Sequence, residues 1–244
     1  MPRILWAITG AGHLIRDVAK VMLELKKCLG LDVTTVMSVW GYHVARIYGV
    51  LPLLREISPG SYYNELLIGA KGFHYLGRVT TRRYNTVVVA PASANTVAKM
   101  VLGIADTLPT MVAAQAQKAG VPLIVLPTEV PNTQGVVISE TPCFIDRGLC
   151  KAEICGKCSA AEACPVNAIE FVDGMPRIDL SKCIGCEKCV RACRYGAVRC
   201  WERIEVRVRR IDIENVEKLK RLEGVIVVES VEELAKALKR VLRA

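Results

Sequence analysis

Eight cysteines between residues 150 and 193 constrain this chain more than any other feature of its sequence. They form two runs, Cys150-x4-Cys155-x2-Cys158-x5-Cys164-Pro165 and Cys183-x2-Cys186-x2-Cys189-x3-Cys193. Three cysteines in short steps let one loop bind three corners of an Fe4S4 cube, while the fourth cysteine of each run reaches the other cube. The spacing therefore predicts two [4Fe-4S] clusters with crossed ligation. The expected ligands are Cys150, Cys155, Cys158 and Cys193 for the first cluster, and Cys183, Cys186, Cys189 and Cys164 for the second.

The two runs are also an internal repeat, because Ile145-Asp146-x3-Cys150 matches Ile178-Asp179-x3-Cys183. Duplicated half-sites are typical of proteins that hold two clusters. The second run has the ferredoxin spacing, whereas two loops of the first are longer and Arg194 follows Cys193 where proline is usual. The longer loops leave open which of the first three cysteines bind, and whether Cys164 is displaced.

Zinc is the main alternative, since paired C-x2-C knuckles also bind it. Zinc knuckles come as separated pairs and not as three cysteines two residues apart, so iron is favoured over zinc, and a disulfide framework is favoured least. Cys28, Cys143 and Cys200 have no place in the pattern. We expect each of these three to be a small buried hydrophobic side chain.

At 244 residues and 52% apolar content, the chain is long enough for one large and one small domain. No run of about 18 apolar residues could span a bilayer. The apolar start, residues 4–8, runs into a glycine turn without a cleavage site for a signal peptide. We therefore expect a cytoplasmic protein that binds no membrane and keeps its cysteines reduced for metal.

The net charge of +9 raises the question of a nucleic-acid partner. We expect none, because three Phe, three Trp and seven Tyr leave little for an aromatic, basic binding face. The densest basic group is Arg203, Arg207, Arg209 and Arg210. Its alternation with Ile204, Val206 and Val208 predicts a half-buried strand with a solvated basic face. A docking patch for an acidic electron carrier or a polyanionic substrate tail is the alternative.

Residues 1–140 alternate apolar runs with segments of helical period, which predicts a doubly wound parallel α/β sheet. The expected strands are 4–9, 33–37, 86–90 and 123–126. They are rich in Val and Ile without alternation, as expected when helices cover both faces. The expected helices are the apolar stripe Leu14, Ile15, Val18, Ala19, Met22 and Leu25, and the segments 96–102 and 111–119.

After the cysteine runs, residues 216–222 predict a helix that stops at Gly224, and residues 225–228 predict a strand. Ser230 begins a final helix that extends to Leu242. So short a tail has too little core to fold alone. We expect residues 1–140 and 204–244 to form one domain, into which an α+β two-cluster ferredoxin domain, residues 141–203, is inserted.

Ligands of doubly wound sheets bind at the carboxyl ends of the strands. Three loops lie there, Gly10-Ala11-Gly12-His13, Ser38-Val39-Trp40-Gly41 and Pro91-Ala92-Ser93-Ala94-Asn95-Thr96. The first precedes a helix, whose exposed amides favour a phosphate, and an ordinary tight turn is an equal alternative. It is a poor dinucleotide fingerprint, because Ile15 stands where G-x-G-x-x-G requires a small residue. We therefore expect no tightly bound NAD(P)H.

The segment Ala90-Pro91-Ala92-Ser93-Ala94-Asn95-Thr96 resembles the flavin-binding signature of the flavoprotein superfamily typified by the homo-oligomeric flavin-containing cysteine decarboxylases. The matching positions continue at Lys99, Gly103, Asp106, Leu108 and Thr110. The resemblance implies FMN, with Ser93 and Asn95 at the heteroatom edge of the isoalloxazine. It also implies that Ser38 and the loop Gly10, Ala11, Gly12 and His13 hold the phosphate. Ser93 and Asn95 as helix N-cap residues are the alternative, and both roles can coexist.

Decarboxylases of this superfamily carry a catalytic histidine at a fixed distance before the Ala-Pro pair. An ungapped count back from Ala90-Pro91 reaches Gly77, and His74 lies three residues away from that position. The sequence therefore disfavours decarboxylation and prenyl transfer while the flavin signature is retained.

A flavodoxin-like FMN domain with an inserted two-cluster ferredoxin resembles the archaeal iron-sulfur flavoproteins of the dihydromethanopterin reductase (acceptor) type. The opening segment 6–13 and the closing segment 211–224 carry the same likeness. It implies an oxidoreductase in which a one-electron donor such as a ferredoxin reduces the clusters, and FMN then reduces a dihydropterin such as dihydromethanopterin. Relatives in the superfamily imply a homo-oligomer, a trimer or a multiple of trimers.

His13 is the candidate to hydrogen-bond the flavin or protonate the substrate, and a structural role is an equal alternative. A function of a different class is a non-catalytic carrier, in which flavin and clusters only relay electrons to a partner protein. A pocket over the flavin wide enough for a pterin would favour the enzyme.

Overall fold

A six-stranded parallel sheet forms the centre of the computed structural model, which describes residues 1–243. The strand order is β12-β5-β4-β1-β2-β3. The strands are β1 Arg3–Ile8, β2 Asp32–Met37, β3 Leu66–Ile68, β4 Thr86–Ala92, β5 Leu123–Pro127 and β12 Val225–Val227. β4 is buried at all seven positions, as expected for a central strand covered on both faces. The predicted α/β sheet is confirmed.

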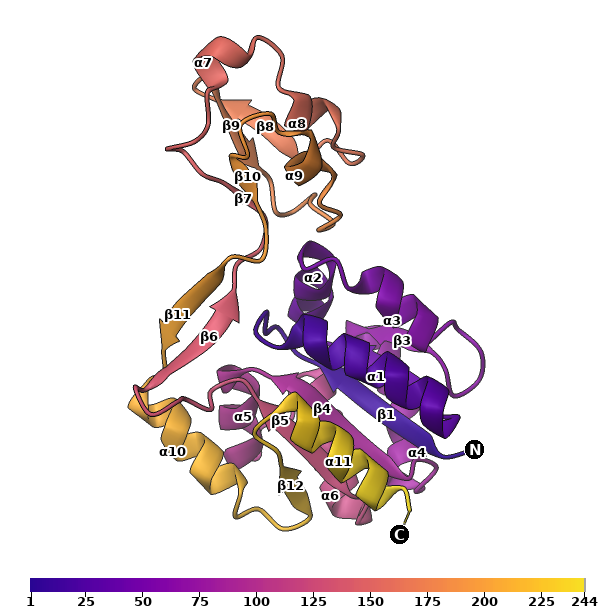
Figure 1. Cartoon of the computed structure of the whole chain (residues 1–244). Helices are drawn as coiled ribbons and strands as arrows, with labels where there is room; N and C mark the ends of the chain where they lie inside the picture. Colours follow the sequence, from indigo (N-terminus) through magenta and orange to yellow (C-terminus); the bar gives the residue numbers. More distant parts are fainter. Residues whose placement is uncertain (244) are drawn as a thin grey trace.

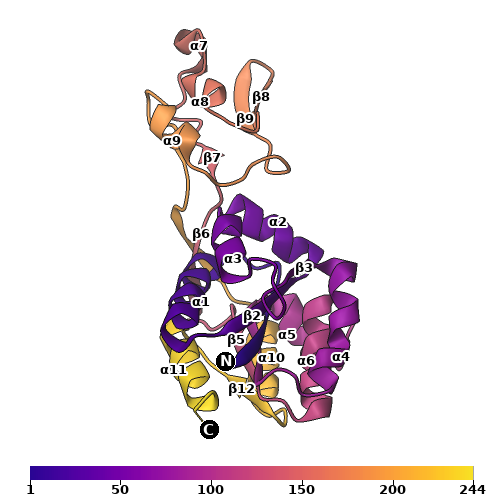
Figure 2. The same ribbon diagram turned by 90° about the vertical axis from the view of Figure 1, so that its right-hand side faces the viewer.

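Helices cover both faces of the sheet, with α1 and α11 in front of it in Figure 1, and the three layers are visible edge-on in Figure 2. One layer holds α1 Ile15–Leu29, α2 Val39–Ile47, α3 Leu51–Ile57 and α11 Val231–Val241. The other holds α4 Leu76–Thr80, α5 Ala94–Val101, α6 Leu108–Ala119 and α10 Arg210–Leu219. Each layer encloses its own apolar core against the sheet. The arrangement leaves the carboxyl ends of β1, β2 and β4 as the edge where ligand-binding loops can gather.

Local sequence explains where the first and last helices lie. The apolar stripe of α1 is buried against the sheet at Ile15, Val18, Ala19, Met22 and Leu25, as the spacing predicts, whereas Leu14 precedes the helix as its N-cap at φ 65° and is half-buried. Gly30 ends α1 in the left-handed region at φ 60°, which glycine adopts without steric cost. The Ser230 hydroxyl accepts a hydrogen bond from the Glu233 amide at 3.1 Å and so caps α11.

The C-terminal tail adds its strand to the large sheet. β12 pairs in parallel with β5, and α11 packs against α1 with Leu234 and Leu238 fully buried. The helix before it, α10, runs from Arg210 to Leu219 and not over the predicted 216–222. It starts earlier because Asp212 in its first turn accepts two hydrogen bonds from the Arg209 guanidinium, at 2.7 and 2.8 Å.

A two-stranded antiparallel ribbon leads out of this domain. β6 Val136–Glu140 pairs with β11 Arg203–Arg207, and further along β7 Phe144–Ile145 pairs with β10 Val198–Arg199 (Figure 1). Glu140 lies opposite Arg203 and Ile145 opposite Val198, so both pairs share one register.

The prediction of a half-buried strand at the basic group is wrong. All five residues of β11 are exposed, Ile204 by 42% and Val206 by 38%, because the ribbon stands clear of the sheet and no second layer covers it. Arg209 and Arg210 lie beyond the strand, at the start of α10.

The cysteine runs fold at the far end of the ribbon into a small module. Its other elements are α7 Ala152–Cys155, α8 Ser159–Glu162, β8 Ile169–Val172, β9 Met175–Ile178 and α9 Lys188–Ala192. Its apolar core is small and consists of Ala160, Ile169, Cys189 and Val198. A core of this size gives little stability by itself, so we expect the module to depend on bound metal.

The internal repeat is visible as a repeated turn. Asp146 accepts from the amide of Gly148 and Asp179 from that of Ser181, at 2.9 and 2.8 Å, just before the two cysteine runs. In both turns the backbone carbonyl of the aspartate accepts from the amide of the first cysteine of its run, at 3.0 Å.

None of the helices within residues 1–243 has the length and apolar character needed to cross a bilayer.

Candidate iron-sulfur and flavin sites

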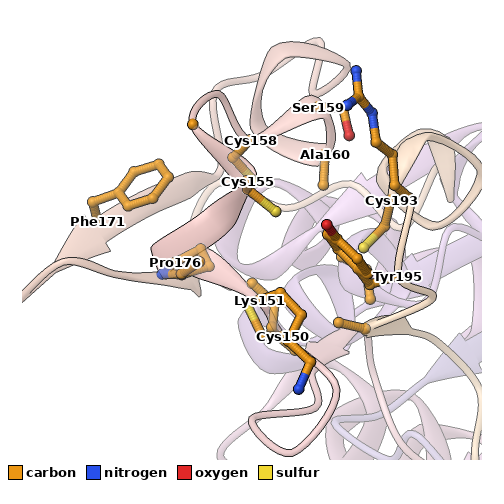
Figure 3. A pocket seen from close by; sticks show the side chains of 16 residues that line it. Cys150, Lys151, Cys155, Cys158, Ser159, Ala160, Phe171, Pro176, Cys193 and Tyr195 are labelled. Carbon is orange, nitrogen blue, oxygen red and sulfur yellow. The ribbon is translucent and has the colours of Figure 1, made fainter.

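The four thiols of the first predicted set line one cavity (Figure 3). Cys150 follows β7, Cys155 ends α7, Cys158 precedes α8 and Cys193 follows α9. The lining residues of this cavity all fall between 145 and 198, so the cavity belongs to the small module alone. The structure therefore brings Cys193 of the second run to three cysteines of the first run, which is the arrangement that crossed ligation requires.

The thiols of the second set lie close enough to influence one another's ionisation. Burial raises the pKa of Cys189 to about 11, and the neighbouring Cys183, Cys164 and Cys186 contribute to the increase. Cys164 thus joins the three cysteines of the second run. A thiol with so high a pKa is protonated at neutral pH, so metal binding there must release a proton.

Crowding of thiols also marks the first set. Partial burial raises the pKa of Cys155, the thiols of Cys158, Cys150 and Cys193 add to the increase, and Arg194 opposes it. Four thiolates at this spacing repel one another unless a metal centre neutralises them. The sulfur chemistry of both sets therefore fits a cationic iron core.

Backbone amides point at several of the sulfurs. Ala168 N–H donates to the Cys164 Sγ at 3.2 Å, and Gly185 N–H donates to the Cys183 Sγ at 3.4 Å. Burial alone would raise the pKa of Cys193, but the amides of Val198 and its neighbours outweigh it, and the pKa is lowered. Such N–H donors stabilise anionic sulfur and tune cluster potentials.

The described residues contain no group of three His, Cys, Asp or Glu side chains that could hold a single metal ion. A four-iron cube binds its thiolates at its corners and so needs them farther apart than the ligands of one tetrahedral ion, which lie about 2.3 Å from zinc. Four thiols that line one cavity are the donor set that an iron-sulfur cube takes, and the individual ligand assignments remain predictions.

The expectation that Cys28, Cys143 and Cys200 are small buried hydrophobic side chains with reduced thiols holds only for the burial of Cys143, which is 2% exposed, and is otherwise wrong. Cys28 is exposed on α1, and Cys143 forms a disulfide with Cys200. Sequence spacing does not indicate this pairing, because the two cysteines are 57 residues apart. The register of the ribbon, which pairs Phe144 with Arg199, sets them directly opposite each other.

Thr9 joins the first and third loops of the candidate flavin site. Its buried hydroxyl donates to the Pro91 carbonyl at 2.7 Å and accepts from the Ser93 amide at 2.9 Å. The Trp6 indole donates to the Ala90 carbonyl at 2.6 Å, and the Ala90-Pro91 peptide is cis. The sequence prediction did not include Thr9, although its position at the end of a predicted strand could have suggested it.

The second loop packs tightly under the first. A Cβ on Gly41 would lie 2.6 Å from the Ile8 carbonyl oxygen, and one on Gly10 would lie 2.9 Å from the Trp40 Cβ. The Ser38 hydroxyl accepts from the Gly41 amide at 2.9 Å and caps α2. The predicted phosphate loops therefore pack together at two glycines, where a larger residue would clash.

Both roles proposed for the third loop are compatible with its geometry. Ser93 is the N-cap of α5, and its hydroxyl accepts from the Thr96 amide at 3.4 Å. Asn95 lies in the first turn of α5 and is exposed, so its amide is available to a ligand. The rest of the signature shapes the turn after α5, where Lys99 pairs with Asp106 at 2.6 Å.

A cavity of about 410 Å³ opens beside Ser38. Its walls include Trp40, Phe73, Leu108 and Met111, with Asp106 and Thr107 at the turn between α5 and α6. Trp40 is 73% and Phe73 56% exposed in the single chain. The size of the cavity falls in the usual range for small-molecule sites, roughly 300–1,000 Å³.

His13 does not line this cavity. It lines two depressions, one beside Ser139 and Glu140 of β6 and one beside Glu229 and Ser230. Burial lowers its pKa, although Asp17 and Glu140 oppose the shift. The imidazole is therefore neutral at physiological pH, and its contact with a flavin remains a prediction.

We expect Ser93→Ala and Asn95→Ala to weaken FMN binding by about 1–3 kcal/mol each, because each removes a polar group that is predicted to hydrogen-bond the flavin. Ser93→Ala also removes a helix cap, which costs about 0.5–2 kcal/mol of stability. Ser230→Ala is the matched control, because it removes the same kind of cap from α11. Fluorescence titration of apoprotein with FMN checks the prediction. If Ser93→Ala, Asn95→Ala and Ser230→Ala all bind FMN with equal affinity, the third loop serves only as the N-cap of α5 and does not contact the flavin.

The chain is similar along nearly its whole length to two archaeal enzymes. Dihydromethanopterin reductase (acceptor) of Methanosarcina mazei is 40% identical over 235 residues, which cover 94% of this chain and 96% of the relative. The enzyme of the same name from Methanocaldococcus jannaschii is 41% identical over 92% of this chain and 91% of its own. The chain belongs to the dihydromethanopterin reductase (acceptor) family.

A solved structure shares the fold of this dihydromethanopterin reductase (acceptor) family member along the whole chain. The crystal structure of DmrB from Burkholderia xenovorans in complex with FMN, described as a cubic protein cage for redox transfer, is 26% identical to this chain. The similarity covers 99% of this chain and 96% of DmrB, with a TM-score of 0.62. HAL3 from Cryptococcus neoformans shares the fold at 12% identity and a TM-score of 0.51.

Two family models match separate parts of the chain. The model described as Flavoprotein matches residues 1–133, and the model described as 4Fe-4S binding domain matches residues 176–199. The chain is thus an oxidoreductase with a flavoprotein module and an iron-sulfur module. The second match covers Cys183 to Cys193 only, so the cluster of the first run is a proposal.

Proposed function

We propose that this chain takes single electrons from a low-potential donor protein such as a ferredoxin and uses them to reduce a dihydropterin. The acceptor is of the dihydromethanopterin type, and the product is its tetrahydro form. The observation that carries the proposal is the 40% identity to the Methanosarcina mazei enzyme across both modules of the chain. Two [4Fe-4S] clusters would supply one-electron steps, and FMN would supply the hydride equivalent that reduction of a C=N bond needs.

Different residues of the chain bind the clusters, the flavin phosphate and the flavin ring. The thiols and amides of the ferredoxin module hold the clusters, the Gly10–His13 loop and Ser38 hold the flavin phosphate, and Ser93 with Asn95 hydrogen-bond the flavin ring. The cavity beside Ser38 adjoins the proposed phosphate site and supports a place for a flat heterocycle, because Trp40 and Phe73 offer aromatic faces to such a ring. Room for a pterin over the bound flavin in this cavity would favour the enzyme over a carrier that only passes electrons onward.

Gly77 supports reduction over decarboxylation or prenyl transfer. It lies with His74 in a depression that also contains Thr80 and Lys118, and neither Gly77 nor His74 lines the cavity beside Ser38. His74 is exposed. We therefore assign no histidine of this segment to the chemistry.

We also propose that the protein works as a homo-oligomer, a trimer or a multiple of trimers. Exposed apolar side chains gather around the same cavity, at Val39, Trp40 and Phe73, and continue at Leu102 and Ile104 after α5. A second copy that covers these side chains would remove apolar surface from water and close the site. The cubic cage formed by the Burkholderia xenovorans relative supports an oligomer by analogy.

A single-turnover experiment tests the function. The anaerobic protein is reduced fully with a low-potential one-electron donor, excess donor is removed, and dihydromethanopterin is added while flavin absorbance is recorded. We expect prompt reoxidation of the flavin and one tetrahydro product for each two electrons lost. If the reduced flavin is not reoxidised by any dihydropterin but transfers electrons to a partner protein, the protein is an electron carrier and not a dihydropterin reductase.

A further inference from the structure

The two predicted cluster sites lie at different places relative to the flavin domain. The cavity of the first set is enclosed by the ferredoxin module alone. The second set is joined to the flavin domain through the loop that carries Cys183 and Cys186. There the Arg46 guanidinium of α2 donates to the Leu180 carbonyl, three residues before Cys183, at 3.2 Å.

The contact between the modules is a backbone contact between two glycines. A Cβ on Gly49 would lie 2.6 Å from the Gly185 carbonyl oxygen, and one on Gly185 would lie 2.5 Å from the Gly49 nitrogen. Both glycines have positive φ, 69° and 60°, a region that other residues rarely adopt. Gly185 stands between Cys183 and Cys186, and Gly49 follows α2. Only residues without side chains permit this approach.

The same region reaches the predicted phosphate loop through an aromatic pair. The Trp201 indole donates to the carboxylate of Glu187, the residue after Cys186, at 2.7 Å. The centre of the Trp201 ring lies 5.4 Å from the centre of the Tyr48 ring. The Tyr48 hydroxyl donates to the Glu140 carbonyl at 2.6 Å, and a Cβ on Gly12 would lie 2.4 Å from that hydroxyl. The ring of Tyr48 therefore touches both the ribbon and the flavin loop.

Arg16 holds this pair in place. Its guanidinium lies 4.4 Å from the centre of the Trp201 ring and 3.1 Å from the Glu140 carboxylate. The Trp201 backbone has φ 63°, a conformation that a bulky residue keeps only when its surroundings fix it. The contact between the ferredoxin module and the flavin domain is thus packed and hydrogen-bonded by several residues.

We propose that the second cluster, held by Cys183, Cys186, Cys189 and Cys164, is the one that reduces the flavin, and that Gly49, Tyr48 and Trp201 position it. In each transfer one electron leaves the reduced second cluster and enters the flavin. Two transfers and two protons from solvent complete flavin reduction, and the first cluster, resupplied by the donor protein, restores each electron. The proposal rests on the proposed function only in that the clusters feed the flavin.

Gly49→Ala tests the positioning without touching a cysteine or a flavin loop. Gly30→Ala is the matched control, because Gly30 has φ 60° and nothing lies within 4 Å of its Cβ, so the backbone strain is similar and no module contact is disturbed. Iron and FMN content are measured first. Hydrogen exchange then reports on the amides of residues 183–187, and stopped-flow absorbance reports on flavin reduction by one-electron donor, with no pterin present.

We expect Gly49→Ala to speed exchange of those amides and to slow flavin reduction roughly tenfold or more, since electron transfer depends on alignment. Gly30→Ala should change neither. Looser amides with an unchanged rate of flavin reduction would overturn the proposal. If Gly49→Ala fails to fold, Trp201→Leu replaces it and should give the same pair of changes.

Cluster-selective variants assign the direction of transfer. In Cys186→Ser the first cluster should still be reduced while the flavin stays oxidised, whereas in Cys155→Ser the flavin should still be reduced by a small one-electron donor that reaches the second cluster. The reverse pattern would overturn the proposal. Because no acceptor is added, a wrong choice of dihydropterin cannot produce either result.

Discussion

Replacing Cys186 by serine is expected to remove about half of the iron, from about eight to about four per chain, because each [4Fe-4S] cube needs four. The lost cluster should be the one that also depends on Cys164, since the pKa of Cys189 responds to Cys164 together with Cys183 and Cys186. Cys193→Ser should remove the other cluster, because Cys193 lines the cavity of Cys150, Cys155 and Cys158. Iron and sulfide analysis with electron paramagnetic resonance of the reduced protein identifies which cluster is lost.

Cys28→Ser is the control for this series, because Cys28 is exposed on α1 and belongs to neither set. It should leave the iron content unchanged. If Cys186→Ser and Cys193→Ser remove the same cluster, the ligation is not crossed. Zinc in place of iron in the anaerobically purified protein would exclude both clusters.

The second large effect concerns stability. Leu234→Ala on α11 should lower the free energy of unfolding of the flavin domain by about 2–5 kcal/mol, the usual cost of truncating a fully buried leucine. Leu234 is 0% exposed and belongs to the same core as Ile4, Trp6 and Ile15 of the N-terminal segment. Denaturant unfolding followed by circular dichroism and flavin fluorescence measures the change.

This variant tests whether residues 1–140 and 204–244 form one cooperative domain. Ile226→Ala on β12 is the comparison within the same tail, and because Ile226 is 38% exposed it should cost clearly less. A single transition shifted by Leu234→Ala supports one discontinuous domain. Flavin that is released at an unchanged denaturant concentration would mean that the tail is dispensable.

The sheet was predictable because its central strands carry continuous Val and Ile runs and α1 carries a regular stripe. The segment between Ser38 and Asn85 was not predicted in detail. It holds β3 of three residues, the 3-10 helix Gly69–Tyr75 and the short helices α2, α3 and α4. Elements of this length give too few periods for the pattern to separate them from loops, and β3 is fixed by pairing with β2.

At the sites too, features set by residues close in sequence were predictable, whereas contacts between distant segments were not. The cysteine spacing predicted both groups of thiols because three cysteines of each group are close in sequence and the repeated run supplies the fourth. The Cys143–Cys200 disulfide and the contact of Gly49 with Gly185 depend on how distant segments meet, and spacing carries no information about that. Thr9 and Trp201 are similar cases, since each acts through a partner loop that spacing does not connect to it.

The register of the ribbon bears on how such a chain could arise. Glu140 and Arg203 face each other in the ladder, so the ferredoxin module leaves and re-enters its host at adjacent positions. A hairpin at this point could be closed by a short turn, and none of the six strands of the large sheet would change its neighbour. Insertion of the module at this point therefore requires the loss of only one surface turn of the flavoprotein fold, and surface turns are where insertions are best tolerated.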